Sequence, residues 1–87
     1  MWTLAFKPSV ESNDTKKISK QNWNAIDEDI QNLKSDPLPP GVKKIKKGKD
    51  AHYRIRRGPF RIGYKLDFGK KIIRIMYVKR RTKSTYR

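Results

Sequence analysis

The chain has 87 residues, a formal net charge of +15 at pH 7 and 34% hydrophobic residues, enough for one small core but not for a closed cavity around a large cofactor. It contains no cysteine and one histidine, so it offers neither a disulfide framework nor a thiolate or histidine-rich metal site, and we expect no metal and no cofactor. No stretch approaches the roughly 20 apolar residues of a membrane span and the N-terminus lacks a signal-peptide profile, so we predict a single cytoplasmic domain over residues 1–87 with no membrane partner.

The positive charge is concentrated in the second half of the chain. Residues 1–42 carry five Lys/Arg against six acids, whereas residues 43–87 carry eighteen against two. Such an excess favours a polyanion as partner: nucleic acid first, then an acidic protein, then an anionic lipid surface. A solvated basic surface or a disordered basic tail is the alternative. It is disfavoured because the cations alternate with β-branched and aromatic residues.

The first half predicts one strand followed by one or two helices. Residues 1–7 alternate apolar and other side chains until Pro8, which indicates a short strand. Residues 9–21 are weakly patterned and predict a short or frayed helix. In residues 22–35, large apolar side chains recur at i, i+3, i+7 and i+10, with acids on the opposite side. This segment predicts an amphipathic helix that ends before Pro37.

A proline-rich connection leads into the most cationic stretch of the chain, residues 42–50. Two interpretations are open, a loop that binds a phosphate backbone and a solubilising turn before the next strand. The first is preferred because the lysines immediately precede a row of arginines. The candidate RNA-binding residues here are Lys43, Lys44, Lys46, Lys47 and Lys49.

Residues 52–67 predict a β-hairpin, because apolar and basic side chains alternate on both sides of Gly58-Pro59. Glycine at the first position of a two-residue loop suits a type II′ turn. Such a loop pairs two arginines and two isoleucines across the strands: Arg56 with Arg61, and Ile55 with Ile62. Like charges directly across a strand pair are destabilising, so cations gathered on this face favour a bound anion. The basic face would hold Arg54, Arg56, Arg61 and Lys65.

Residues 71–78 predict a central strand, because both of its faces are apolar. One face would hold Ile73, Ile75 and Tyr77, and the other Ile72, Met76 and Val78 beside Arg74. Residues 79–87 lack apolar periodicity and alone would be a disordered basic tail. The order of elements predicts an α+β fold, in which one or two N-terminal helices cover one face of a small, mostly antiparallel four-stranded sheet.

The sequence contains no motif for nucleotide hydrolysis, zinc proteolysis or serine hydrolysis, and six of its eight acids lie in the first half, which speaks against a two-carboxylate or Mg²⁺ site. Cations, hydroxyls and one imidazole suit the cleavage of RNA by its own 2′-hydroxyl, since the substrate supplies the nucleophile. Arginine can bind two oxygens of the transition-state phosphate, but it is a poor general base. The base would be Tyr86, His52 or a lysine with a lowered pKa.

A series of short motifs from residue 36 onward carries a family resemblance. They are Asp36-Pro37-Leu38, a lysine-rich loop with Gly48, the run Tyr53-Arg54-Ile55-Arg56, Gly58, Phe60-Arg61-Ile62, Tyr64, the apolar stretch from Ile72 to Val78, Arg80-Arg81 and Tyr86-Arg87. In this order they resemble the RelE/ParE toxin superfamily, and the resemblance extends over nearly the whole chain. It implies a microbial RNase-like fold and a toxin of a type II toxin–antitoxin operon.

The resemblance also implies roles for individual residues. RelE-type members cut mRNA in the ribosomal A site, whereas ParE-type members poison DNA gyrase and lack the catalytic set. The chain matches the basic and tyrosine positions of the RelE branch, although some relatives carry lysine where Arg54 and Arg56 stand. By this resemblance Arg61 and Arg81 stabilise the transition-state phosphate and leaving group, and Tyr86 orients or deprotonates the 2′-hydroxyl. The implied catalytic set is Arg54, Arg56, Arg61, Arg81 and Tyr86, with Arg80 and Lys83 as further RNA-binding residues.

We therefore predict a metal-independent, ribosome-dependent endoribonuclease toxin that acts on mRNA. Its partner would be an acidic antitoxin that wraps the basic face in a heterotetramer or a larger assembly. The basic tail at residues 79–87 would contribute to the site. Two alternatives are kept: a ParE-like inhibitor of DNA gyrase, and a basic RNA-binding or ribosomal protein without catalysis.

Overall fold

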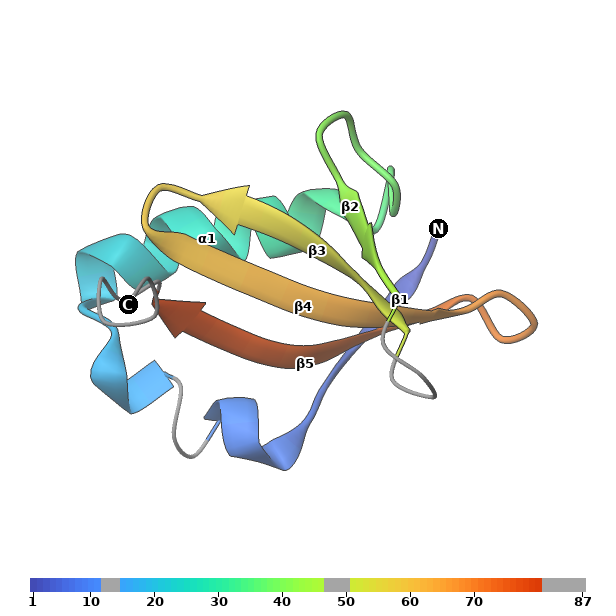
Figure 1. Cartoon of the computed structure of the whole chain (residues 1–87). Coiled ribbons are helices and arrows are strands. Elements are labelled where there is room, and N and C mark those ends of the chain that lie inside the picture. Colours follow the sequence, from blue (N-terminus) through green and yellow to red (C-terminus); the bar gives the residue numbers. More distant parts are fainter. Residues whose placement is uncertain (12–14, 47–50, 81–87) are drawn as a thin grey trace.

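The computed structural model describes residues 1–11, 15–46 and 51–80. Within these residues one five-stranded sheet has the strand order β1-β5-β4-β3-β2, and helix α1 packs on one of its faces (Figure 1). β1 runs parallel to β5, and every other neighbouring pair is antiparallel. The predicted α+β class is confirmed. The elements are β1 (Thr3–Phe6), α1 (Lys20–Asn32), β2 (Lys43–Ile45), β3 (His52–Arg57), β4 (Phe60–Asp67) and β5 (Ile72–Arg80).

The fifth strand, β2, corrects the predicted count of four. It lies in the lysine-rich stretch that was expected to be a loop, and it pairs with the outer edge of β3. Its sequence has little β-propensity, so its side chains give no strand signal. The strand forms because the edge of β3 presents unpaired backbone N–H and C=O groups, which β2 satisfies.

Helix α1 begins and ends earlier than the predicted range of 22–35. It starts after Ser19, whose hydroxyl accepts a hydrogen bond from the backbone N–H of Asn22 at 3.2 Å and so caps the first turn. It ends at Asn32, and Leu33 occupies the C-cap. The weakly patterned segment before it contains a helical turn at residues 8–11 and a 3-10 helix at Thr15–Lys17.

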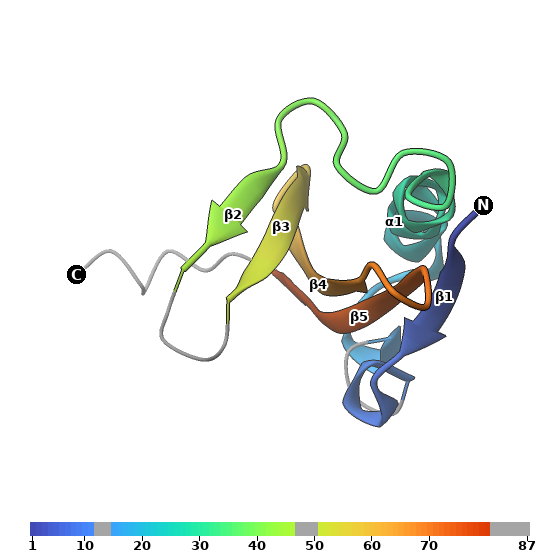
Figure 2. The same cartoon turned by 90° about the vertical axis from the view of Figure 1, so that its right-hand side faces the viewer.

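The core lies between α1 and the sheet, which curves around the helix (Figure 2). Apolar residues of the helix face those of β4 and β5, as the helical and strand periodicities require. The opposite face of the sheet contributes nothing to this core. The buried residues are Val10, Ile26, Ile30, Leu33, Phe60, Ile62, Tyr64, Ile73, Ile75 and Val78. Among the described residues, no helix combines the length and apolar character that a membrane span needs.

The β3–β4 hairpin has the predicted register. Ile55 pairs with Ile62, and Arg56 pairs with Arg61. Gly58 has a φ of +56°, whereas the ring of Pro59 holds its own φ near −65°, and this combination defines a type II′ turn. The turn fixes the register locally, which is why the sequence was sufficient to predict it.

A β-bulge between β4 and β5 changes which face Tyr77 occupies. Gly63 pairs with Tyr77, whereas the next residue, Tyr64, pairs with Ile75, so Met76 is the extra residue. Tyr77 therefore lies on the face away from α1, and Val78 returns to the core. The prediction that Tyr77 shares a face with Ile73 and Ile75 is wrong, because it assumed an unbroken period of two.

Tyr64 connects the core to the proline-rich segment that precedes β2. Its hydroxyl donates a hydrogen bond to the carbonyl oxygen of Pro37 at 2.6 Å, and burial raises the pKa of this tyrosine well above its ordinary value. We expect Tyr64→Phe to lower the free energy of unfolding by about 1 kcal/mol, the typical net value of such a bond. Denaturant unfolding measures this.

The same tyrosine predicts a pH dependence of stability. Because the folded pKa of Tyr64 exceeds the unfolded value near 10, the stabilisation is complete below about pH 10 and is lost as the pH rises above it. Tyr64→Phe should lose less stability than the wild type in that alkaline range. Tyr53→Phe is the comparison, because no described residue hydrogen-bonds to its hydroxyl and its charge contributes less than burial does to the raised pKa of Tyr64. It should keep most of the alkaline loss, and an equal loss in both variants would contradict the assignment.

Candidate nucleic-acid interface

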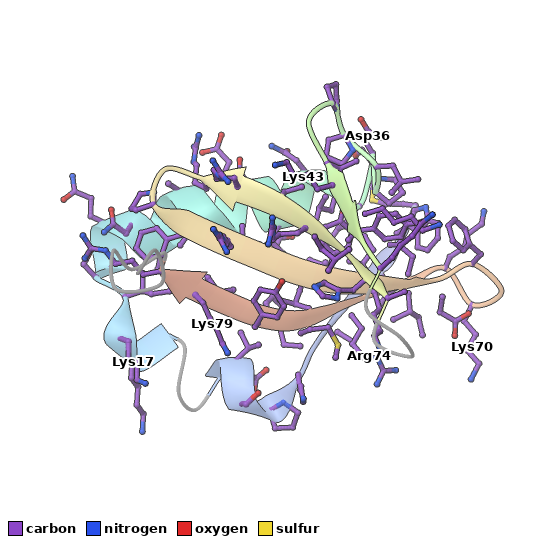
Figure 3. All side chains as sticks on the ribbon, viewed as in Figure 1. Lys17, Asp36, Lys43, Lys70, Arg74 and Lys79 are labelled. Atoms are coloured by element: carbon purple, nitrogen blue, oxygen red, sulfur yellow. The ribbon has the colours of Figure 1, made fainter. Side chains whose placement is uncertain are left out.

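Seven described cations lie on the face of the sheet that α1 leaves uncovered, and five of them form two neighbouring rows. One row crosses three strands, because Arg56 pairs with Arg61 and Arg61 pairs with Lys79. A second row begins with Lys43 paired to Arg54. Figure 3 labels Lys43 and Lys79, which lie on β2 and β5 at the two sides of this group. We call Lys43, Arg54, Arg56, Arg61 and Lys79 the cationic face.

No described acid neutralises the cationic face. An ion pair joins the Nε of Arg57 to the Oδ2 of Asp29 at 3.3 Å, on the side of the sheet that packs on α1. The Nε of Arg61 is buried and has no hydrogen-bond partner in the described part of the chain. An unsatisfied buried donor and facing like charges both cost stability, so this arrangement is suited to a bound anion.

A hollow of about 200 Å³ lies beside β2 and β3 at the border of the cationic face. Three cations contribute to its wall, and its remaining lining is a glycine and an isoleucine. Guanidinium groups bind phosphate oxygens in pairs, so this hollow can receive a phosphate group of a nucleic-acid backbone. The lining residues are Gly41, Lys43, Arg54, Ile55 and Arg56.

The structure places the predicted site residues in three groups. Lys43, Arg54, Arg56 and Arg61 lie together. Strand alternation places two more of the predicted residues on the other face of the sheet: Lys44 pairs with Tyr53, and Arg80 pairs with Phe60. Lys46 is exposed just after β2. The remaining predicted residues lie outside the described part of the chain: Lys47, Lys49, Arg81, Lys83 and Tyr86.

Two residues of this face were missed by the sequence reasoning, Lys79 and Tyr77. Lys79 was assigned to the tail, but β5 continues through Arg80. Tyr77 is predicted on the face of Ile73 and Ile75, but it contacts His52: the Tyr77 Oη lies 2.8 Å from the His52 Nε2, and the ring centroids are 5.5 Å apart. The Nζ of Lys79 lies 5.7 Å from the centroid of the Tyr77 ring. The glycine at position 63 was the available signal, because glycine inside a strand indicates a bulge or a close approach.

Gly63 makes room for the Tyr77 ring. A Cβ at residue 63 would overlap the ring atoms of Tyr77, closer than carbon atoms can approach. We expect Gly63→Ala to lower the free energy of unfolding by about 1–3 kcal/mol, as overpacking does. In a Tyr77→Ala background the same substitution should cost much less. A double-mutant cycle in urea measures the coupling.

Gly69→Ala is the control for that cycle. Gly69 lies in the turn between β4 and β5, and a Cβ there would make only an ordinary contact with Asp67. Gly69→Ala should change the free energy of unfolding little, whether residue 77 is tyrosine or alanine. If Gly63→Ala lowered the free energy of unfolding equally with tyrosine or alanine at residue 77, the Tyr77 ring would not pack against Gly63.

A five-stranded sheet with a helix on one face and cations on the other defines a small basic α+β protein. The chain is 37% identical over 70 residues to a Methanocaldococcus jannaschii protein named "Putative toxin RelE1", and the match covers 78% of each chain. A solved RelB–RelE antitoxin–toxin complex from Methanococcus jannaschii contains a chain that is 32% identical, with a TM-score of 0.66 and 93% of both chains covered. No family model matches the chain.

The fold is shared more widely than these identities indicate. A chain of the archaeal RelE–RelB complex from Pyrococcus horikoshii superimposes with a TM-score of 0.79 at 23% identity, over 94% of this chain and 97% of that one. The chain belongs to the RelE/ParE toxin superfamily and is a toxin of the RelE type.

Proposed function

We propose that the chain is a ribosome-dependent endoribonuclease that cleaves mRNA in the A site. The RNA 2′-hydroxyl is the nucleophile, and the reaction needs no metal ion because cations of the protein stabilise the transition state. Residues 1–87 act as one toxin domain, and the basic segment at residues 79–87 adds Arg81 and Tyr86 to the site.

The observation that carries this proposal is the row of Arg56, Arg61 and Lys79 without an acidic partner among the described residues. A phosphorane-like transition state carries more negative charge than the ground-state phosphate. Fixed cations therefore favour the transition state over the bound substrate, which is the requirement for catalysis. Arg61 lies in the middle of the row and is the residue expected to contact that phosphate.

The proposed partner in the resting cell is an acidic antitoxin that wraps the cationic face. Related RelE chains have been solved in complexes with RelB antitoxins, including those of the two archaeal relatives above. An acidic segment would neutralise the facing like charges that the free protein holds at a cost. The assembly would be a heterotetramer or larger, in the cytoplasm where ribosomes translate.

The experiment that tests the function is controlled expression of the chain followed by mapping of mRNA 5′ ends. Growth arrest with new ends inside codons of translated messages, and none in untranslated RNA, supports the proposal. Intact messages together with a DNA-damage response would favour the gyrase inhibitor instead. Intact messages without growth arrest would favour a non-catalytic RNA-binding protein.

A further inference from the structure

Tyr77 and His52 form a contact on the cationic face that none of the roles above uses. The Oη of Tyr77 and the Nε2 of His52 are 2.8 Å apart, and the two rings meet edge to face with an interplanar angle of 82°. Both side chains are partly buried. They come from β5 and β3, on opposite sides of Gly63 in β4, so a distant pair of residues has been brought together by the sheet.

Two local irregularities are required to hold Tyr77 there. The bulge at Met76 turns its side chain out of the core, and the absence of a side chain at Gly63 lets its ring lie over β4. A regular strand would have placed the tyrosine against α1 with the apolar residues. Bulges are frequent beside active sites, where they redirect a side chain.

We propose that Tyr77 is a catalytic residue that takes the proton from the RNA 2′-hydroxyl, with His52 as the positioning residue that accepts the tyrosine proton in turn. This inference rests on the proposed function and supplies its general base. Tyr77 pairs with Gly63, which also pairs with Arg54, so the phenol lies in a row that ends at the hollow lined by Lys43, Arg54 and Arg56.

The proposed step is balanced in protons and electrons. The 2′-oxygen loses its proton to the Tyr77 Oη as the phenol proton passes to the Nε2 of neutral His52. The 2′-oxygen then forms a bond to the adjacent phosphorus, and the bond from phosphorus to the 5′-oxygen breaks. Water gives a proton to the departing 5′-oxygen, and the imidazolium later returns its proton to water. The products are a 2′,3′-cyclic phosphate and a 5′-hydroxyl.

Cations surround the pair on the neighbouring strands. They help to hold a phosphate near the phenol. A hollow of about 240 Å³ beside His52 is lined in part by lysines. The charged groups that face the pair are Arg54 on β3, Lys65 on β4, and Arg74 and Lys79 on β5.

The test is single-turnover cleavage of mRNA on purified programmed ribosomes by the full chain and two variants. Tyr77→Phe keeps the ring and removes the hydroxyl, and it should reduce the cleavage rate about 10²-fold, the lower end for proton-transfer catalysis. His52→Gln should reduce the rate by about 10-fold and flatten the dependence of the rate on pH. Binding of both variants to the same ribosomes should change less than about two-fold.

Tyr53→Phe is the matched control, because it removes a tyrosine hydroxyl from the adjacent residue on the core face of β3. It should retain the wild-type rate and pH profile. Tyr77→Phe with the wild-type rate, or His52→Gln with the wild-type pH profile, would overturn the inference and leave the proposed function intact. A wild-type protein that cuts no message would overturn both.

Discussion

Arg61→Ala should reduce the single-turnover rate of mRNA cleavage about 10²–10³-fold, the effect of losing one fixed contact to a transition-state oxyanion. Arg61 is the central cation of its row, with Arg56 on one side and Lys79 on the other. Its buried Nε lacks a hydrogen-bond partner among the described residues, so its guanidinium is positioned to donate to a ligand. Arg61→Lys should recover only part of the rate, because an ammonium group cannot bind two phosphate oxygens in a fixed plane.

Stability separates this catalytic effect from a folding defect. Arg61→Ala removes one of three adjacent like charges, which relieves repulsion, and it also removes the partly buried methylene groups of the arginine. Its free energy of unfolding should therefore fall by no more than the loss of those methylene groups explains. Arg74→Ala is the control, since it removes the same charge from an exposed position on β5, opposite Lys65 and outside the row. Arg74→Ala should cut mRNA within about three-fold of the wild-type rate. Equal losses in the two variants would mean that net charge, and not the row, governs cleavage.

The hairpin and helix α1 could be predicted from the sequence because their determinants are local. A Gly-Pro pair fixes the turn, the turn fixes the register, and the register brings Arg56 and Arg61 together. Apolar spacing defined the helix, although its ends depended on the Ser19 cap and not on periodicity.

What could not be predicted depends on contacts between strands. β2 forms by backbone pairing with β3, which leaves no trace in the pattern of its lysines. One extra residue, Met76, reverses the face of every later position in β5, so period-two reasoning placed Tyr77 on the face of Ile73 and Ile75. The site was therefore predicted as arginines from the hairpin and a distant tail, whereas the cationic face also contains Lys79 and surrounds a tyrosine–histidine pair. The glycine at position 63 carried the missing information.

The core between α1 and the sheet supplies the stability that offsets the repulsion within the cationic face. Ile30 is fully buried on α1 and belongs to the core between the helix and the sheet. Ile30→Ala should lower the free energy of unfolding by about 2–5 kcal/mol, because it removes buried methylene groups and leaves a cavity. A small domain has about 5–15 kcal/mol in total, so this single change would consume a large part of it.

Ile45→Ala provides the contrast, since Ile45 lies on the edge strand β2 and is only partly buried. Its loss should cost under about 1 kcal/mol, in proportion to the smaller apolar area removed from water. Denaturant unfolding of both variants measures the difference, and a cost for Ile30→Ala as small as that for Ile45→Ala would show that α1 does not hold the sheet. Because anion binding relieves the repulsion among the cations, added polyanion should recover part of the stability that Ile30→Ala loses, and it should recover less when Arg61 is also replaced.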